Sequence, residues 1–189
     1  MPLTQLDSTP ALVVIDLQKG LAALPAVHPI AEIVTRTAQL ANAFRQRRLP
    51  VVLVNATGTA PGRTDAGPRS FSFPPDWTEL VPELEAISGH HKISKERWGA
   101  FLGTSLDDYL RAEKVTQIVL TGVATSIGVE STARSAYDLG YNVTLVLDAM
   151  TDLSPDAHRH SIENIFPRLG ETAATSDVLK LLHEMPDTQ

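Results

Sequence analysis

Asp16 is placed where a carboxyl group could do acid–base chemistry. It directly follows the apolar residues 12–15, so its side chain should lie at the end of a buried strand and lose part of its water. Loss of water raises the pKa of a carboxyl group, which suits it to act as a general acid or base near neutral pH. An aspartate that only accepts hydrogen bonds from a loop or caps a turn would stand at the same position, and the pattern favours neither interpretation.

Lys95 is a second candidate because it lies in the charged segment 92–97, close to Trp98 and Phe101. A cation beside aromatic rings suits a mostly apolar pocket that holds an anionic substrate, here near Asp16. A solvated basic loop has the same composition and is the commoner structure. We treat Lys95 as a candidate catalytic residue, and Trp98 and Phe101 as candidate substrate contacts.

Residues 121–130 lead from an apolar run into a segment of helical pattern, whose first backbone N–H groups could hold an anion or an oxyanion. Ser126 and Gly128 resemble the second half of a hydrolase nucleophile elbow, but Ala124 stands in place of its first glycine. We therefore favour Ser126 as the N-cap of the helix over Ser126 as a nucleophile.

Short apolar, β-branched runs alternate with longer segments of helical period, which predicts an α/β fold around a parallel sheet. The predicted strands are residues 11–15, 51–54, 91–93, 117–120, 143–147 and 171–173. Apolar spacing predicts helices over residues 30–44 and 126–139, the latter with Tyr137 on its apolar side. Thr104 and Asp107 have the spacing of a capping box, and Ser154 precedes a proline as an N-cap does.

The ligand site of a doubly wound sheet lies beyond the carboxyl ends of the strands, where the strand order reverses. Asp16 closes the first predicted strand, residues 122–128 follow the fourth, and Asp148 closes the fifth. These positions are therefore the ones at which we expect the site.

Length and composition limit the classes of protein. The 189 residues are enough for a core, and we expect one domain over residues 1–189. The 16 basic and 22 acidic residues give a net charge of −6 without a basic run, which argues against nucleic acid and anionic membranes as partners. There is no cysteine, so a cysteine nucleophile is excluded. A secretory signal and a membrane-spanning run are not recognisable, so we expect a cytoplasmic protein.

No cofactor is predicted. The glycines of residues 122–128 lack the spacing of a dinucleotide fingerprint, and no Walker A sequence occurs. Two histidines at i, i+2, such as His158 and His160, point in different directions on a helix, so a shared metal is not expected. The partner that we expect is a small-molecule substrate.

Three blocks in the right order together resemble the isochorismatase-like hydrolase superfamily. They are residues 13–18, residues 95–106 and residues 121–133. The resemblance covers most of the chain and implies a six-stranded parallel sheet flanked by helices in three layers. Amidase members of the superfamily use an aspartate, a lysine and a nucleophilic cysteine. Asp16 and Lys95 match the first two, and Gly128 stands at the position of the cysteine.

Isochorismatases resemble this chain in having glycine there, and they cleave a vinyl ether by acid catalysis. The resemblance implies that Asp16 donates the proton, that Lys95 binds a substrate carboxylate, and that the backbone of Gly128 leaves space for substrate or water. It also implies that Ala124 and Thr125 lie at the substrate, although isochorismatases typically carry a tyrosine at the position of Ala124.

The long loop at residues 55–77 contains Arg63 and Arg69. A guanidinium group can bind a substrate carboxylate, but both residues could equally be solvated residues of the loop. Two alternatives to vinyl ether hydrolysis remain open. One is an amide hydrolase in which water replaces the thiol, and the other is a binding or scaffolding protein without catalysis.

Three further expectations follow from the resemblance. Nicotinamidases carry metal ligands where this chain has residues 55–58, Asn-Ala-Thr-Gly, so we expect no bound metal. Family members tend to have a cis peptide after the matching glycine, here between Val123 and Ala124. They also assemble, so we expect a homodimer or homotetramer, with the helix from Ser126 and the proline-rich loop as candidate contacts.

Overall fold

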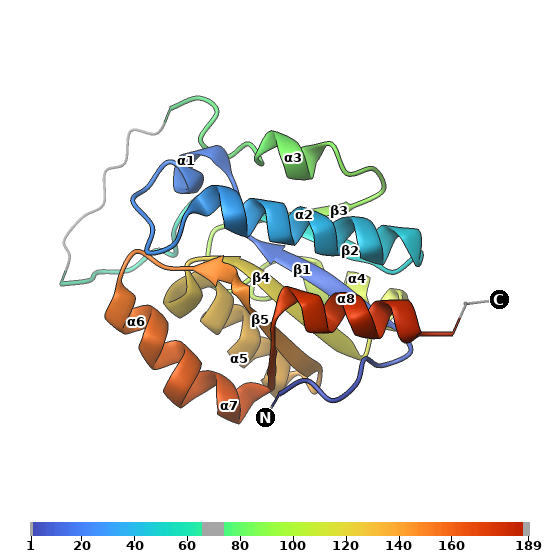
Figure 1. The fold of residues 1–189 in the computed structure, drawn as a ribbon. Helices are drawn as coiled ribbons and strands as arrows, with labels where there is room; N and C mark the ends of the chain where they lie inside the picture. Colours follow the sequence, from blue (N-terminus) through green and yellow to red (C-terminus); the bar gives the residue numbers. More distant parts are fainter. Residues whose placement is uncertain (1, 66–73, 187–189) are drawn as a thin grey trace.

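A parallel sheet of six strands forms the centre of the protein in the computed structural model, which describes residues 2–65 and 74–186 (Figure 1). The strands are β1 (Pro10–Ile15), β2 (Val51–Ala56), β3 (His91–Lys95), β4 (Gln117–Val123), β5 (Asn142–Thr151) and β6 (Glu171–Ala173). They lie in the order β3-β2-β1-β4-β5-β6, and all are paired in parallel. All six predicted strands are present, and the order reverses between β1 and β4 as a doubly wound fold requires.

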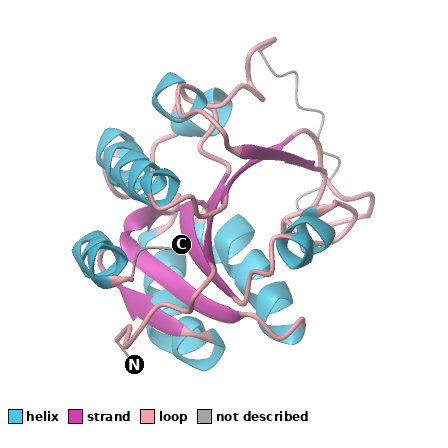
Figure 2. Cartoon of the chain, turned by 90° about the vertical axis from the view of Figure 1, so that its right-hand side faces the viewer, coloured by secondary structure: helices cyan, strands magenta, loops and turns pink. Residues whose placement is uncertain are grey.

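Helices cover both faces of the twisted sheet, which makes the three layers of the predicted fold (Figure 2). The α-helices are α1 (Lys19–Ala22), α2 (Ile30–Gln46), α3 (Pro82–Glu85), α4 (Leu106–Ala112), α5 (Glu130–Asp138), α6 (Pro155–His160), α7 (Phe166–Leu169) and α8 (Thr175–Glu184). Two π-helical turns, η1 (Thr125–Val129) and η2 (Ser161–Ile165), lead into α5 and α7. None of the helices in the described chain is long and apolar enough to cross a membrane.

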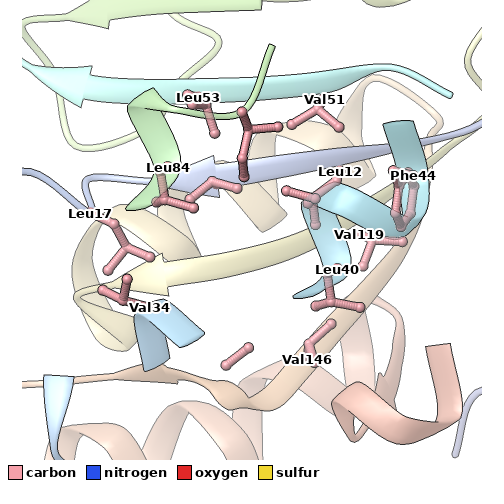
Figure 3. Packing of buried hydrophobic residues seen from close by; sticks show 14 of the residues in the cluster. Leu12, Leu17, Val34, Leu40, Phe44, Val51, Leu53, Leu84, Val119 and Val146 are labelled. Carbon is pink, nitrogen blue, oxygen red and sulfur yellow. The ribbon is translucent and has the colours of Figure 1, made fainter. Parts of the chain in front are cut away.

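The core has two halves because side chains of a strand alternate between the faces of the sheet. Leu12 and Val14 of β1 pack with residues of α2, α3 and α8 on one face. Figure 3 shows Leu12 with Phe44 of α2 and Leu84 of α3 in this cluster. Ala11, Val13 and Ile15 pack with residues of α4, α5 and α7 on the other. Every residue of β1 is therefore buried, which explains why the strand is apolar without alternation.

β5 is longer than predicted, and the placement of Asp148 at a strand end is wrong. The strand continues to Thr151 past a register shift between Leu120 and Gly122 of β4. Asp148 lies within it, and its Oδ1 accepts hydrogen bonds from the backbone and the hydroxyl of Thr175 at the start of α8. The residue that follows the strand is Asp152.

Two local predictions about helices are also wrong, and a third is confirmed. Thr104 and Asp107 form no capping box, because the Asp107 carboxylate instead accepts hydrogen bonds from Arg111 and Tyr141. Tyr137 is 54% exposed and does not lie on the buried side of α5. Ser154, in contrast, is confirmed as an N-cap, since its hydroxyl accepts from the N–H of Ala157.

Candidate active site

Asp16 follows β1 at the edge where the strand order reverses. Its backbone is in the left-handed region, with φ of 53°, and the residue is only 5% exposed. Burial raises the pKa of its carboxyl group from 3.8 to about 6, although the charge and hydrogen bond of Lys95 act in the opposite direction. The group is therefore protonated in a large fraction of molecules near pH 6.

Lys95 is the last residue of β3 and is 3% exposed. Its Nζ donates to Asp16 Oδ2 at 2.7 Å and to the carbonyl oxygen of Arg97 at 3.0 Å. Asp16 Oδ1, in contrast, is buried without a hydrogen-bond partner among the described residues. The carboxyl group therefore has one oxygen held by a cation and one that is free to carry a proton.

Gly128 lies beside the same carboxyl group, in η1. A Cβ atom built there would lie 2.9 Å from Ile15 Cγ2 and 3.2 Å from Asp16 Oδ2. Thr132 holds this backbone in place, since its hydroxyl donates to the Gly128 carbonyl at 2.7 Å and accepts from the N–H of Ala100. The structure thus brings together Asp16, Lys95 and Gly128, the three candidate catalytic residues.

The turn that joins β4 to η1 has the cis peptide expected between Val123 and Ala124. Gly122 begins it with φ of 119°, and a Cβ there would lie 2.0 Å from the carbonyl oxygen of Ile15, so β1 and β4 approach too closely for a side chain. Ala124 also lines a cavity of about 30 Å³.

Ser126 is not the N-cap of this helix, contrary to our expectation. Ala124 precedes the first helical residue, and the N–H of Ser126 donates to the carboxylate of Asp152 at 2.6 Å. Asp152 was missed in the sequence because Asp148, a polar residue after an apolar run, was expected to end the strand that in fact continues to Thr151. The signal that could have found it is the apolar pair Ala149–Met150 between the two aspartates.

Thr125 makes a contact that no sequence pattern indicated. Its buried hydroxyl lies 2.9 Å from Nδ1 of His158, whose ring centre is 4.9 Å from that of His28. Burial lowers the pKa of His158, His28 lowers it further, and the charge of Asp152 opposes them. His158 is thereby favoured in its neutral form, in which it can share a hydrogen bond with Thr125.

A cavity of about 650 Å³ lies between the segment after β3, the loop at residues 59–64 and α5. Trp98, a predicted substrate contact, lines it and is 54% exposed. Phe101 does not line it, because this side chain is buried in the core with its ring 5.9 Å from that of Tyr141. Arg63 is exposed beside the cavity without lining it, and Arg69 lies outside the described residues.

The described residues contain no group of three histidine, aspartate or glutamate side chains placed to hold a metal ion. Asn55, at the position where nicotinamidases carry a metal ligand, uses both ends of its amide within the protein. It donates to the carbonyl of Thr78 at 2.7 Å and accepts from Ser94 at 2.8 Å. These residues do not fit a metal site.

Comparison with known proteins assigns the class. Residues 10–177 match the model of the isochorismatase domain, so the chain belongs to the isochorismatase family, a family of hydrolases. It is 39% identical to the uncharacterized isochorismatase family protein YwoC of Bacillus subtilis over 178 residues, which are 90% of this chain and 92% of that protein.

Two solved structures support this assignment. An isochorismatase family protein from Burkholderia thailandensis superposes with a TM-score of 0.90 at 44% identity, over 95% of this chain and 98% of the other. N-carbamoylsarcosine amidase from Thermoplasma acidophilum superposes with a TM-score of 0.73 at 26% identity, over 88% and 96%.

Proposed function

We propose that this protein hydrolyses a vinyl ether of a small carboxylated molecule, of the kind that isochorismate exemplifies, with Asp16 as the general acid. The observation that carries the proposal is the buried carboxyl group of Asp16, with its pKa raised to about 6 and with one oxygen that has no partner in the described chain. Acid catalysis needs a carboxyl group that keeps its proton near the working pH, and this group is of that kind.

The reaction needs no covalent intermediate. Asp16 Oδ1–H gives its proton to the terminal CH₂ carbon of the vinyl ether, and an oxocarbenium ion forms. Water adds to the cationic carbon and loses a proton to the Asp16 carboxylate, which restores the acid. The hemiketal then breaks its bond to the alcohol oxygen, which leaves a ketone and an alcohol, so that one water molecule is consumed in total.

Lys95 has two roles in this reaction, because it stabilises the Asp16 carboxylate and binds the substrate. Its charge stabilises the Asp16 carboxylate that exists between the first and the second proton transfer. Two of its three N–H bonds have acceptors in the described chain, namely Asp16 Oδ2 and the Arg97 carbonyl. The third is left for a carboxylate of the substrate.

Gly128 has no side chain, so this position cannot supply the nucleophile of a covalent mechanism. The methyl group of Ile15 and the carboxyl group of Asp16 occupy the space where such a side chain would begin. The space at the Cβ position of Gly128 is therefore filled, and does not hold substrate or water as the resemblance implied. A glycine also supplies no nucleophile for a thioester-like intermediate.

Amide hydrolysis with water as the nucleophile is the second candidate function, and the likeness to N-carbamoylsarcosine amidase favours it. It requires attack on an amide carbonyl by water that Asp16 would activate as a base. The raised pKa of Asp16 reduces the fraction of carboxylate available as that base below about pH 6. A binding protein without catalysis is the remaining alternative, and it would return every ligand unchanged.

The test is proton NMR of the purified protein with isochorismate in D₂O. Acid catalysis at carbon predicts pyruvate that carries one deuterium in its methyl group. Asp16→Asn should lower the rate by roughly a hundredfold or more, while Asp156→Asn, whose side chain is 86% exposed, should leave it unchanged.

Three outcomes contradict the proposal. One is the absence of pyruvate, another is pyruvate without deuterium, and the third is an unimpaired Asp16→Asn protein. Release of ammonia from a panel of amides and carbamoyl amino acids, abolished in Asp16→Asn, would establish the second function instead.

A further inference from the structure

Two side chains that follow β5 in the chain hold the first residues of η1. The backbone N–H of Ser126 donates to Asp152 Oδ2 at 2.6 Å. The hydroxyl of Thr125 lies 2.9 Å from Nδ1 of His158, which belongs to α6. The turn after the cis peptide is therefore fixed from outside by one carboxylate and one imidazole.

The Thr125 hydroxyl depends on His158 for its hydrogen bond. Thr125 is fully buried, and His158 is the only partner of its hydroxyl in the described part of the chain. A buried hydroxyl hydrogen without an acceptor costs free energy, so the satisfied arrangement is the one in which Thr125 donates and Nδ1 accepts. That arrangement requires the neutral Nε2–H tautomer of His158, because both ring nitrogens of an imidazolium are donors.

The surroundings of His158 favour this neutral form. The titratable groups that act on its ring are His28, from the loop before α2, and Asp152. Burial lowers the pKa of His158 and His28 lowers it further, whereas Asp152 acts in the opposite direction. The His28 ring is in turn held by Thr151, whose hydroxyl lies 3.0 Å from its Nδ1 and accepts from its backbone N–H. His158 is thus supported by a second segment as well as by its own helix.

The turn that His158 holds brings Gly128 to the acid. Thr125 begins η1, and Gly128 belongs to the same five-residue turn. The fit at Gly128 is close, since a Cβ there would lie 3.2 Å from Asp16 Oδ2. His158 forms no hydrogen bond with Asp16 or Lys95 among the described residues. Any effect of His158 on the acid pair therefore passes through the turn.

We infer that His158 is a positioning residue, which holds the turn carrying Gly128 beside Asp16 by accepting a hydrogen bond from Thr125. The inference rests on the proposed function for the reaction that it affects. The hydrogen bond and its effect on the turn, in contrast, are measured without substrate.

The first experiment follows the His158 ring by ¹H–¹⁵N NMR over a range of pH. The neutral ring should be the Nε2–H tautomer. Thr125→Val removes the donor that favours the neutral form, so the midpoint of the His158 titration should rise. His160 is exposed on the same helix, and its ring signals should be the same in both proteins. An Nδ1–H tautomer, or a His158 midpoint that Thr125→Val leaves unchanged, overturns the inference.

The second experiment compares two variants of His158. His158→Leu removes the acceptor, whereas His158→Asn keeps an oxygen acceptor near the position of Nδ1. In His158→Leu the amide signal of Gly128 should shift, and kcat for isochorismate should fall roughly tenfold while KM changes less than about twofold. His158→Asn should keep more than about half of kcat. Equal losses in the two variants overturn the role of the hydrogen bond.

His160→Leu is the matched control, because it makes the same change at an exposed position of α6. It should leave the Gly128 signal, kcat and KM unchanged. A control variant that loses as much activity as His158→Leu would assign the effect to the helix and overturn the inference.

A double variant tests whether the two residues act through each other. In the Thr125→Val protein the hydrogen bond is already absent, so the further change His158→Leu should lower kcat by less than about twofold. A further tenfold loss would show that His158 acts by another route, and it overturns the inference.

The two proposals fail separately. Pyruvate production with an unchanged kcat in His158→Leu overturns the positioning role and leaves vinyl ether hydrolysis intact. Absence of pyruvate overturns the reaction, and the Gly128 signal then decides the inference alone. A shift in His158→Leu supports the hold on the turn, and an unmoved signal overturns it.

Discussion

The backbone N–H of Ser126 donates a hydrogen bond of 2.6 Å to Asp152 Oδ2, which ties the turn after β4 to the residue after β5. The other oxygen of Asp152 accepts from the N–H groups of Leu153 and Ser154. One carboxylate thus fixes the segment that carries Gly128 against the end of the neighbouring strand.

Asp152→Asn should therefore destabilise the protein by about 2 kcal/mol, because an amide group replaces an acceptor of charge-assisted hydrogen bonds at a site that is 3% exposed. The measurement is urea denaturation. Asp156→Asn removes a carboxylate that is 86% exposed and should cost less than about 0.5 kcal/mol. Equal losses in the two variants would show that the Asp152 contacts contribute nothing.

The rate should depend on pH through Asp16, whose pKa is raised to about 6. Because the protonated group is the acid, kcat/KM should be level below about pH 6 and fall tenfold per pH unit above it. The folded pKa exceeds the ordinary 3.8, so Asp16 also stabilises the fold below about pH 4, and this contribution is lost as the pH rises through 6. A rate that rises with pH across this window would instead make the carboxylate the active form.

Lys95→Met should raise the pKa of Asp16 further. Both the charge and the hydrogen bond of Lys95 lower this pKa, so their removal leaves burial unopposed. We expect the midpoint of the Asp16 carboxyl ¹³C titration to move upward by roughly one pH unit or more. An unchanged or lower midpoint would mean that Lys95 does not set the ionisation of Asp16.

Gly128→Ala should impair both stability and catalysis. The new methyl group would press on the buried Ile15 and on Asp16 Oδ2, and overpacking of this kind costs about 1–3 kcal/mol, partly offset by the better helix propensity of alanine. We expect a net loss of about 1 kcal/mol and a rate reduced by more than about tenfold.

Gly58→Ala is the matched control for stability, since a Cβ there meets only the flexible side chain of Glu96. It should change the free energy of unfolding by less than about 0.5 kcal/mol. A Gly128→Ala protein with full activity would show that the close approach to Asp16 has no part in the reaction.

The strands and Asp16 could be predicted because they leave a local signal in the sequence. A strand covered on both faces is apolar throughout, and a polar residue directly after it, such as Asp16, lies at the sheet edge. Lys95 was a candidate from the charged segment beside Trp98 and Phe101, but a solvated loop has the same composition, and only the family resemblance indicated its role. The strand that ends at Lys95 is short, lies at the sheet edge and has polar residues in its exposed positions.

The remaining site residues depend on contacts between distant segments. Asp152 accepts a hydrogen bond from the N–H of Ser126, which lies 26 residues earlier in the chain. His158 forms a hydrogen bond with the hydroxyl of Thr125, which lies 33 residues earlier. Phe101 is an aromatic residue close to charged residues, as in many binding pockets. Its ring packs against Tyr141, however, and the side chain is buried in the core. No pattern within a window of sequence contains these partners.

Asp16 and Lys95 come from strands that are not neighbours, since β2 lies between β1 and β3. The ion pair therefore exists only in molecules in which the outermost strand on that side has joined the sheet. Detachment of this strand would withdraw the counter-ion and admit water to the carboxyl group in one event, while the apolar centre stays assembled. An activity that depends on this ion pair should therefore be lost before the core unfolds as denaturant is added.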